Sequence, residues 1–461
     1  MRTRRAAGAL LACLAIVAGC TGGVSTANPS SAASNSAASS GASGAGQEKI
    51  TLTYWGYREG MVAPTGKTAA KAIADFEASH PNVTVNVVPM ETSDFDLKLP
   101  TAFDTPGGPD IVYIGSEPNH LGRYVQANQV LNLDPYLAQY GWDKLLPAVA
   151  ARTTYNGHQY GVGWELETLG LMYNKKIFDR LGLQPPATLE DLETLMATIK
   201  QKAPDIVPLT LAQGAPGNGI HMMHAIGYAT IPTAEILATV PFGSGNYTDP
   251  GWLQMLQRFQ SWAQAGYFPK GANGVGWENH WADFCAGKDA MLAQGTWLFS
   301  TISDCQTANP DKFEFGFVPF PVAKGMPFQA YTGVGKAWRF PESLAKDPQK
   351  LQAALELVAA MTTAPGVALS WVNQDQLFPG VPFDKTAANL TDQQKTALGI
   401  FDQAGANGGA VDIGFNNSSG ETAVWVKDMQ GIFSGTTTPE QAIKDLQSTL
   451  DKEKADWKSG T

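Results

Sequence analysis

Cysteine and charge are both scarce in this sequence. Only four of its 461 residues are cysteine and 16% are charged, so it is neither a disulfide-rich scaffold nor a disordered chain, and 48 Gly with 29 Pro exclude a collagen-like one. Lys and Arg total 32 against 42 Asp and Glu, and the one strongly basic cluster is Arg2, Arg4 and Arg5, so nucleic acid is a poor candidate partner. What is present is 44% apolar residues in a chain long enough for two domains with substantial cores.

Acidic residues and tryptophan are missing from the start of the chain. The first 46 residues contain no acid, and all 12 tryptophans lie from Trp55 onward. Three arginines precede Ala6–Gly19, a run of 14 small or apolar residues that is typical of a secretory signal peptide (residues 1–19) and too short for a membrane span. Residues 21–46 are almost all Ser, Ala, Gly, Thr and Asn, and such a segment cannot bury enough apolar surface to offset its ordering entropy. We therefore expect a disordered tether over residues 20–46 and a folded body from about residue 47.

The predicted signal peptide ends in Val17–Cys20 (VAGC), which resembles the lipobox of bacterial lipoproteins. The resemblance implies cleavage before Cys20, acylation of this cysteine and attachment of the protein by its lipid to the outer face of the cell membrane. Cleavage would remove three arginines and no acids, which changes the net charge from −10 to −13. A plain secretory signal that happens to contain Cys20 is the alternative.

Strand and helix patterns alternate along the body. Apolar runs that alternate or are β-branched predict strands, and apolar residues at helical spacing predict helices. Strands are expected over 49–54, 83–88, 109–114 and 160–173, and helices over 67–79, 121–127, 176–181, 189–202, 252–265, 348–361 and 439–453. Thr188 and Asp347 are the expected N-caps of two of these helices. The alternation predicts an α/β layered fold, and because Gly and Pro are scattered, we expect two lobes joined by crossing segments.

Several segments occur in the order typical of one family. They are KITLTYWG, FEASHPNVTVNVV, PDIVYIGSE, YVQANQVLNLDPYL, YGVGWELETLGLMYNKKIFDRLGLQPPATLEDL, GKDAMLAQGTW and TTTPEQAIKDLQ. The ordered set resembles the sugar-binding lipoproteins of bacterial ABC importers, the maltose-binding-protein-like family. The resemblance implies a two-lobed periplasmic-binding-protein fold of type II, with discontinuous lobes joined by hinge crossings and the ligand cleft between them. The lobes would be residues 47–165 with 334–380, and residues 166–333 with 381–461.

Enzyme motifs are absent from the sequence. It contains no His-Glu-x-x-His, no phosphate-binding Gly-rich loop with Lys and no Gly-x-Ser-x-Gly elbow. His221 and His224 would share a helix face, but no third ligand is evident nearby, so we expect neither a metal nor a cofactor. Cys285 and Cys305 are the cysteines left after cleavage besides Cys20, and in an exported chain we expect them to form a disulfide, with two buried free thiols as the alternative.

Glu165 and Glu167 are two residues apart on an expected strand, so their side chains would face the same way, about 6.6 Å apart along the chain. This separation falls within the range of an inverting glycosidase pair. Such a pair flanks the scissile bond from opposite sides, however, whereas neighbours on one strand approach from one side. The family resemblance implies instead that Glu167 accepts hydrogen bonds from sugar hydroxyls at the hinge, a task that suits acceptor-only carboxylate oxygens. Solvated surface glutamates are the alternative for both residues.

Aromatic residues would provide the apolar part of a sugar site, because a Trp ring can stack on the C–H face of a pyranose. The resemblance implies that Trp297, in Gly295-Thr296-Trp297, is the family's stacking residue in the second lobe. Ser116 and Glu117 follow an expected strand where the family's maltose receptor has an Asp-Arg pair, so the resemblance does not extend to maltose as the ligand. Further candidate sugar contacts lie near strand ends or in loop-like contexts: Trp55, Tyr57, Arg58, Glu59, Trp164, Trp277, Asn279, Tyr331 and Trp371. Packing is the alternative for each of these aromatics, and we assign Trp252 and Trp262 to packing.

The sequence thus predicts an extracytoplasmic, lipid-anchored receptor rather than an enzyme. It would bind a carbohydrate, expected to be an oligosaccharide, and deliver it to the transmembrane subunits of an ABC permease by closing its lobes. We expect a monomer that meets the membrane only through its lipid and binds no nucleic acid. Two alternatives stay open: the same fold with a non-sugar solute, and a tethered cell-surface glycoside hydrolase.

Overall fold

The structure, a computed structural model, describes most of the expected folded body. The described residues are 48–57, 61, 66–116, 120–214, 219–239, 245–405 and 419–459. The predicted signal peptide, Cys20 and the tether lie outside them. Residues 48–461 form a single structural unit.

The first sheet has five strands in the order β2-β1-β3-β12-β6. Strand β1 (Ile50–Tyr57) pairs in parallel with β2 (Val83–Met90) and β3 (Ile111–Gly115). Strand β12 (Lys336–Arg339) comes from a distant part of the chain and pairs antiparallel with β3 and with β6 (Val162–Gly163). Every residue of β3 is buried, as expected for the centre of a sheet that is covered on both faces.

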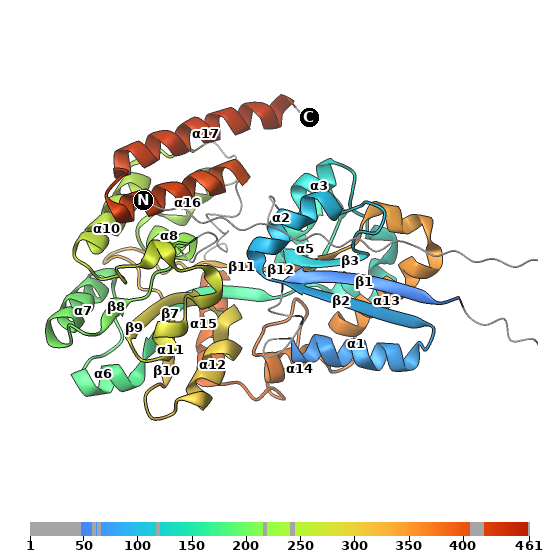
Figure 1. The fold of residues 1–461 in the computed structure, drawn as a ribbon, viewed down its shortest axis with the longest axis horizontal. Helices are drawn as coiled ribbons and strands as arrows, with labels where there is room; N and C mark the ends of the chain where they lie inside the picture. The colour runs from blue at the N-terminus through green and yellow to red at the C-terminus, as the bar shows by residue number, and fades with distance from the viewer. Residues whose placement is uncertain are drawn as a thin grey trace, which may run out of the picture. The chain divides into compact units, whose positions relative to one another are not determined.

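Helices cover both faces of the first sheet (Figure 1). Helices α1 (Lys67–Ser79) and α13 (Pro348–Thr362) pack on one face, where they contribute to the larger of its two cores. Helices α2 (Thr92–Ala102) and α3 (Gly122–Gln126) contribute to a smaller core on the other face.

The second sheet has the order β10-β7-β9-β8, and β11 pairs with the start of β7. Strand β7 (Leu166–Asn174) lies antiparallel between β10 (Phe315–Pro319) and β9 (Asp289–Gly295). Strand β8 (Val207–Leu209) runs parallel to β9, and β11 (Thr332–Val334) runs antiparallel to β7.

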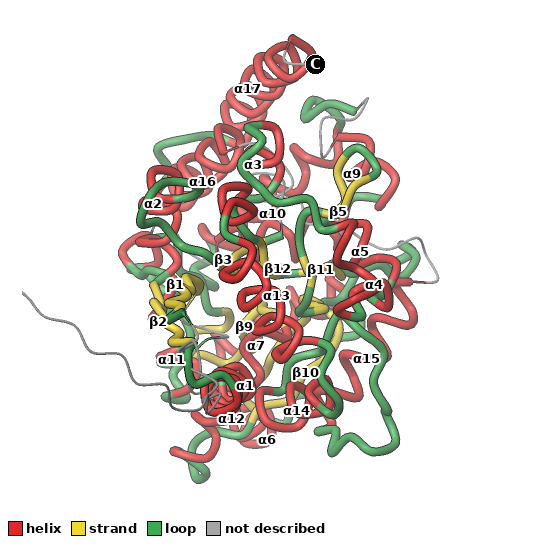
Figure 2. Tube along the Cα trace, turned by 90° about the vertical axis from the view of Figure 1, so that its right-hand side faces the viewer, coloured by secondary structure: helices red, strands yellow, loops and turns green. Residues whose placement is uncertain are grey.

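Helices also surround the second sheet, whose strands lie among them in Figure 2. Helix α8 (Gly219–Thr230) contacts β7 and β9, and the helices that pack on α8 and on one another are α10 (Pro250–Gln264), α16 (Ser419–Ser434) and α17 (Pro439–Ser459). Other helices in contact with strands of this sheet include α6 (Lys175–Leu181), α7 (Leu189–Lys202), α11 (Ala282–Cys285), α12 (Phe299–Ala308) and α15 (Asp392–Gly405).

Short elements complete the described part of the chain. They are η1 (Asp134–Tyr136), α4 (Leu137–Tyr140), η2 (Trp142–Lys144), α5 (Pro147–Arg152), β4 (Thr154–Tyr155), β5 (His158–Gln159), α9 (Thr233–Thr239), η3 (Ala272–Gly274), η4 (Trp277–Asn279), η5 (Thr296–Leu298), η6 (Glu342–Lys346), α14 (Val367–Ser370) and η7 (Trp371–Asp375).

Two segments of the chain cross side by side between the sheets. Strand β6 leads through Trp164 and Glu165 into β7, and β11 leads through Gly335 into β12 in the opposite direction. Backbone hydrogen bonds join the segments: Trp164 N–H donates to the carbonyl of Lys336 at 2.8 Å, and Gly335 N–H donates to that of Glu165 at 2.9 Å. The sheets are therefore linked by a hydrogen-bonded double crossing.

Local sequence signals predict the bounds of several helices well. The helices predicted over 67–79 and 189–202 are confirmed as α1 and α7 with the same bounds. Helix α7 begins with a capping box, in which Thr188 Oγ1 accepts from Asp191 N–H and the Asp191 carboxylate accepts from Thr188 N–H. Asp347 caps α13 in the predicted way through Lys350 N–H.

Two strand predictions are corrected by the structure. The strand expected over 160–173 is divided into β6 and β7, because residues 164–165 cross between two sheets. The strand expected over 49–54 continues to Tyr57, so Trp55 lies inside β1. Since side chains alternate along a strand, Trp55 and Tyr57 both point to the face covered by α2 and α3.

The expected disulfide is confirmed. Cys285 and Cys305 are bonded, with their Cα atoms 5.5 Å apart. The bond joins the end of α11 to α12, the helix that follows Trp297.

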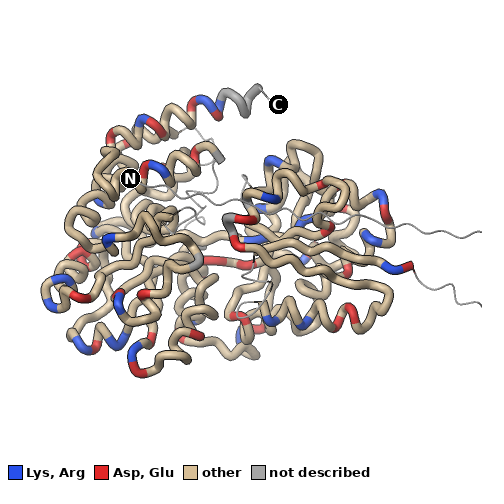
Figure 3. Tube along the Cα trace, viewed as in Figure 1, with Lys and Arg blue, Asp and Glu red and all other residues tan. Residues whose placement is uncertain are grey.

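Charged residues of both signs are distributed over the fold. Figure 3 shows basic and acidic residues interspersed along the helices around both sheets. Among the described residues, no single helix is long and apolar enough to cross a membrane, and α13 with residues 367–375 meets these criteria only as a pair bent by 57°.

Candidate ligand-binding site

Two buried carboxylates meet one lysine at the double crossing. Glu165 precedes β7 and Glu167 is its second residue, and they are only 2% and 6% exposed. Lys336, the first residue of β12, places its Nζ 2.6 Å from Glu165 Oε2 and 3.4 Å from Glu167 Oε1. Both carboxylates thus turn to the same side, in keeping with their two-residue spacing. We call Glu165, Glu167 and Lys336 the acidic cluster.

Polar groups of the first sheet surround this cluster. The Tyr113 hydroxyl donates to Glu165 Oε2 at 3.2 Å. Burial, followed by the charge of Glu165, raises the pKa of the Tyr113 phenol well above its usual value, so the hydroxyl keeps its proton. The buried Ser116 hydroxyl accepts from Arg152 Nε at 3.2 Å and donates to the carbonyl of Val334. Ser116, a predicted sugar contact, therefore links the end of β3 to the end of β11 by a hydrogen bond.

The absence of a side chain at Gly335 leaves space for the Glu167 carboxylate. A Cβ added to Gly335 would lie 1.7 Å from Glu167 Oε1, so a side chain there would force the carboxylate to move, and a Cβ added to Gly333 would lie 3.1 Å from the Tyr331 hydroxyl. Residues two apart in an extended segment point to the same side. The Glu167 carboxylate and the Tyr331 hydroxyl therefore lie on one side of β11.

Aromatic rings from separate parts of the chain gather near Tyr331. The His221 ring on α8 lies 5.2 Å from the Trp277 ring and 5.0 Å from the Trp297 ring, measured between centroids. Trp297 meets Tyr331 edge-on at 6.4 Å. Trp297 and Tyr331 are 9% and 5% exposed, whereas His221 and Trp277 are partly exposed. We call these four residues the aromatic cluster.

A buried amide and a second imidazole support the aromatic cluster. Gln294 Nε2 lies 3.3 Å from His221 Nδ1 and 3.0 Å from His280 Nε2, and Gln294 Oε1 accepts from Gly295 N–H at 3.0 Å. His280 Nδ1 lies 2.5 Å from the Trp277 carbonyl oxygen. Burial lowers the pKa of His280 to about 4, so this ring is neutral near pH 7.

The two clusters offer complementary binding chemistry. Carboxylate oxygens accept hydrogen bonds from hydroxyls, and flat rings contact the C–H faces of a sugar. Glu165 and Glu167 approach one ammonium from one side, which differs from the flanking arrangement of a glycosidase pair. Within the described part of the chain, no group of three His, Cys, Asp or Glu side chains is placed to hold a metal ion.

Trp164 and Trp371, predicted sugar contacts, pack in the core of the first sheet and are corrected to a packing role. Both are fully buried, with their rings edge-on at 6.3 Å, and Trp371 Nε1 donates to the Met361 carbonyl at 2.8 Å. A ligand cannot reach rings that are enclosed in this way. The packing role predicted for Trp252 and Trp262 is confirmed, since both are buried in the core of the second sheet.

Other predicted contacts are dispersed. Tyr57 is buried and meets Phe95 edge-on at 5.3 Å, and Trp55 is partly exposed on the same face of the first sheet. Asn279 is exposed at the end of η4, two residues from Trp277. Arg58, Glu59 and Glu117 lie outside the described residues.

Sequence reasoning misses Lys336, Gln294 and the supporting role of His280. No motif marks Lys336, which reaches Glu165 across 171 positions only because β12 enters the first sheet. Gln294 stands in the quoted segment GKDAMLAQGTW, three residues before Trp297, and this proximity is the one signal that could have found it. His221 is noticed in the sequence only as a possible metal ligand.

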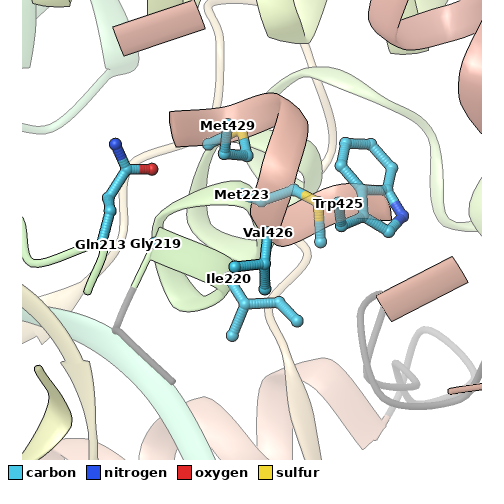
Figure 4. Close-up of a pocket in the computed structure, with 7 residues that line it drawn as sticks. All are labelled: Gln213, Gly219, Ile220, Met223, Trp425, Val426 and Met429. Carbon is cyan, nitrogen blue, oxygen red and sulfur yellow. The ribbon is translucent and has the colours of Figure 1, made fainter. Parts of the chain in front are cut away.

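Two small pockets in the described part of the chain have no room for a sugar. Figure 4 shows a pocket between α8 and α16, lined by Ile220, Met223 and Trp425 among others. Its volume of about 10 Å³ has room for one water molecule at most, and a second pocket beside Tyr331 has the same volume. A groove of about 1330 Å³ beside α1 and α13 contains no residue of the acidic or aromatic cluster.

Comparison with known proteins identifies related sequences and folds. The family described as bacterial extracellular solute-binding protein matches residues 71–397. The Multiple sugar-binding protein of Streptococcus mutans is 26% identical over 372 residues, which are 77% of this chain and 83% of that protein. Among solved structures, a chitin oligosaccharide binding protein has a TM-score of 0.77 at 22% identity and covers 88% of this chain and 99% of its own. A maltose/maltodextrin-binding domain from Bdellovibrio bacteriovorus bound to maltotriose has a TM-score of 0.67 at 21% identity, with 87% and 99% covered. These likenesses show the type II periplasmic-binding-protein fold.

Proposed function

The chain belongs to the bacterial extracellular solute-binding proteins, and on that premise we propose that it captures an oligosaccharide outside the cytoplasm and delivers it to an ABC permease. The observation that carries the choice of ligand is the placement of Glu167 and Tyr331 on one side of β11, where the acidic and the aromatic cluster adjoin. Related proteins named for multiple sugars, chitin oligosaccharide and maltotriose support the same ligand class.

Each cluster has a distinct part in the proposed complex. Glu167 accepts hydrogen bonds from sugar hydroxyls, while Lys336 balances part of the charge of the acidic pair. Trp297 and Trp277 contact the C–H faces of the sugar rings. Trp55 and Asn279 are retained as peripheral contacts because both have exposed surface.

The proposed mechanism is closure of two lobes about the double crossing. The lobes are residues 47–165 with 334–380, and residues 166–333 with 381–461. In this division Lys336 belongs to the first lobe and Glu167 to the second, so the acidic cluster spans the hinge. A ligand that touches both lobes stabilises the closed state, which the permease reads, and no covalent chemistry takes place.

Attachment through a lipid on Cys20 is part of the proposal. Its support is the VAGC segment behind an apolar run, followed by a Ser, Ala and Gly-rich tether. Replacement of Cys20 by Ala should release the protein from the membrane fraction into the medium. Its persistence in the membrane fraction would exclude this anchor.

A thermal-shift screen over mono-, di- and oligosaccharides tests the proposed function. A ligand at 100 times its dissociation constant adds about 2.7 kcal/mol to the stability of the folded protein. Product analysis of the same mixtures separates a receptor from a hydrolase: saturable binding without products supports the proposal, and accumulating products contradict it. A screen in which only non-sugar solutes bind would overturn the choice of ligand.

Trp297→Ala tests the location of the site. We expect at least a tenfold loss of affinity for a sugar that binds the unaltered protein, because the variant loses a stacking surface. Tyr136→Ala is the control, since Tyr136 is a partly buried aromatic residue of η1 that belongs to neither cluster. Unchanged affinity in Trp297→Ala would refute the assignment of the aromatic cluster.

A further inference from the structure

The indole of Trp297 lies against Gly295, two residues before it in the chain. A Cβ added to Gly295 would lie 2.0 Å from Cζ3, 2.2 Å from Cη2 and 2.4 Å from Cε3 of the Trp297 ring. All three atoms belong to the six-membered part of the indole. This part of the ring therefore occupies the space that any side chain at position 295 would need.

Space, and not backbone conformation, is what requires glycine at this position. Gly295 has φ −101° and ψ 176°, an extended conformation that residues with a side chain also adopt. It is the last residue of β9 and pairs with Leu169 of β7 in the regular ladder. A side chain at position 295 is thus compatible with the strand, but not with the observed position of the Trp297 ring.

Packing, rather than a hydrogen bond, orients this indole. Trp297 Nε1 is buried and has no hydrogen-bond partner among the described residues, whereas Trp371 Nε1 donates to the Met361 carbonyl. The contact with Gly295 therefore determines the orientation of Trp297 more than it would determine that of an indole held by its N–H.

The neighbours of Trp297 leave its ring little room elsewhere. Trp297 is 9% exposed, and its ring centroid lies 5.0 Å from that of His221 and 6.4 Å from that of Tyr331. The adjacent residue is also held, because Thr296 Oγ1 accepts from Thr168 N–H at 3.3 Å. Displacement by an added Cβ would therefore move the ring out of its place in the aromatic cluster.

We propose that Gly295 is a positioning residue for ligand binding. By leaving its Cβ space to Trp297, it holds the indole in the orientation in which the ring contacts the sugar, and Gly295 itself touches no sugar. The inference rests on the proposed function, in which Trp297 is a stacking surface. A ring that is already in place loses little rotamer freedom on binding, which lowers the cost of association.

NMR of the unaltered protein without ligand tests the contact. One Hα of Gly295 points to where a Cβ would lie, so nuclear Overhauser effects should join it to the ring protons on Cζ3 and Cη2 of Trp297. The Trp297 signals are identified by their loss in Trp297→Phe. Absence of these effects would overturn the proposal, and the measurement stays decisive if a Gly295 variant does not fold.

Calorimetric titration tests the positioning role, with chitotriose, maltotriose and any further sugar that binds in the thermal-shift screen. Gly295→Ala should bind roughly three- to tenfold more weakly than the unaltered protein, because the stacking surface is displaced. In the Trp297→Ala background, the same Gly295→Ala change should alter affinity by less than about twofold, since no indole is left to displace. A purely structural role would give additive losses instead.

Gly316→Ala is the matched control. Gly316 is a buried strand residue of the same sheet, and a Cβ added to it would lie 2.3 Å from Cζ of Tyr173, a partly buried ring that belongs to neither cluster. Both Gly→Ala variants should unfold at a lower temperature, but only Gly295→Ala should bind sugar more weakly. Equal losses of affinity in the two variants, unchanged affinity in Gly295→Ala, or additive losses in the double variant would overturn the proposal.

Failure of the proposed function has a different signature. If no sugar in the screen binds the unaltered protein, the proposed function fails and the positioning role fails with it. If a sugar binds and Trp297→Ala weakens its binding while Gly295→Ala does not, only the positioning role of Gly295 fails.

Discussion

Tryptophan side chains lie in two contrasting environments in this molecule. In the core of the first sheet, Trp142, Trp164, Trp338 and Trp371 are at most 2% exposed. Their neighbours include other aromatic rings: Trp164 lies 5.8 Å from Trp338 and 6.3 Å from Trp371, both edge-on. These rings stabilise the fold by removing a large apolar area from water.

Near the end of β9 the neighbours of the tryptophan rings include a histidine that contacts a buried amide. Trp277 and Trp297 both contact His221, which is bonded to Gln294, and Trp277 keeps exposed surface. Here the aromatic surface is combined with placed hydrogen-bonding groups, the composition of a ligand site. The comparison teaches that the neighbours of a Trp, more than its local sequence, separate a packing role from the binding role that we propose for Trp277 and Trp297.

Trp371→Ala should give the largest effect of this comparison. Removal of a fully buried indole leaves a cavity, and we expect the free energy of unfolding to fall by about 3–5 kcal/mol in denaturant titration. Trp297→Ala should lose less stability, because Trp297 is 9% exposed whereas Trp371 is fully buried. An equal loss of unfolding free energy in the two variants would show that both rings have a packing role.

Loss of the disulfide should rank next. The bond between Cys285 and Cys305 closes a loop next to the helix that follows Trp297, and replacement of both by Ser should lower the free energy of unfolding by about 3 kcal/mol. Chemical reduction of the unaltered protein should give a similar loss. A double variant as stable as the unaltered protein would show that packing alone holds this region.

Asp289 should make the second sheet sensitive to pH. It is the first residue of β9, the strand that leads to Trp297. Burial raises the pKa of Asp289 from its usual value of 3.8 to about 6, although Thr210 Oγ1 donates to its carboxylate at 2.8 Å. The folded state therefore holds this proton more tightly than the unfolded state, so the stabilisation is present below pH 3.8 and is lost as the pH rises through 6. Asp289→Asn should be more stable than the unaltered protein above pH 6, by at most about 3 kcal/mol, and this advantage should shrink toward pH 4. Thermal unfolding across this range checks the sign, and a constant difference at all pH values contradicts it.

Trp55→Ala should give the smallest effect and decides to which group Trp55 belongs. Its ring is partly exposed on the first sheet, unlike the enclosed rings of that region. If Trp55 contacts the sugar, affinity should fall roughly two- to tenfold, while Trp55→Phe should retain most of it. Calorimetry with a sugar identified in the screen measures this. Unchanged affinity in Trp55→Ala would place Trp55 with the packing residues.

Features that depend on neighbouring residues in the chain could be predicted from the sequence. Short patterns predict the bounds of α1 and α7 and the caps Thr188 and Asp347. The disulfide follows from the number of cysteines left in the exported chain. The division of the strand expected over 160–173 could not be predicted, because it depends on β11 and β12 arriving from a distant part of the chain.

The dependence on long-range contacts also explains which site residues were wrongly predicted or missed. Trp164 and Trp371 lie near Gly or Asn in the sequence, which is typical of loops. In the folded chain both rings pack against Trp338, which is distant from them in the sequence. Lys336 and His221 gain their neighbours only in the folded chain, through contacts that span 171 and 73 positions. Local patterns thus identify segments, whereas long-range contacts determine what each side chain does.

The position of β12 has a consequence for the order in which the protein can fold. This strand lies between β3 and β6, although the chain reaches it only at Lys336. A nascent or partly exported chain that ends before this point leaves the edge of β3 unpaired, and such an edge can pair with other chains. The first sheet, which begins near the N-terminus, is therefore among the later parts of the molecule to be completed, and the chain should stay unfolded there until most of it has left the ribosome or crossed the membrane.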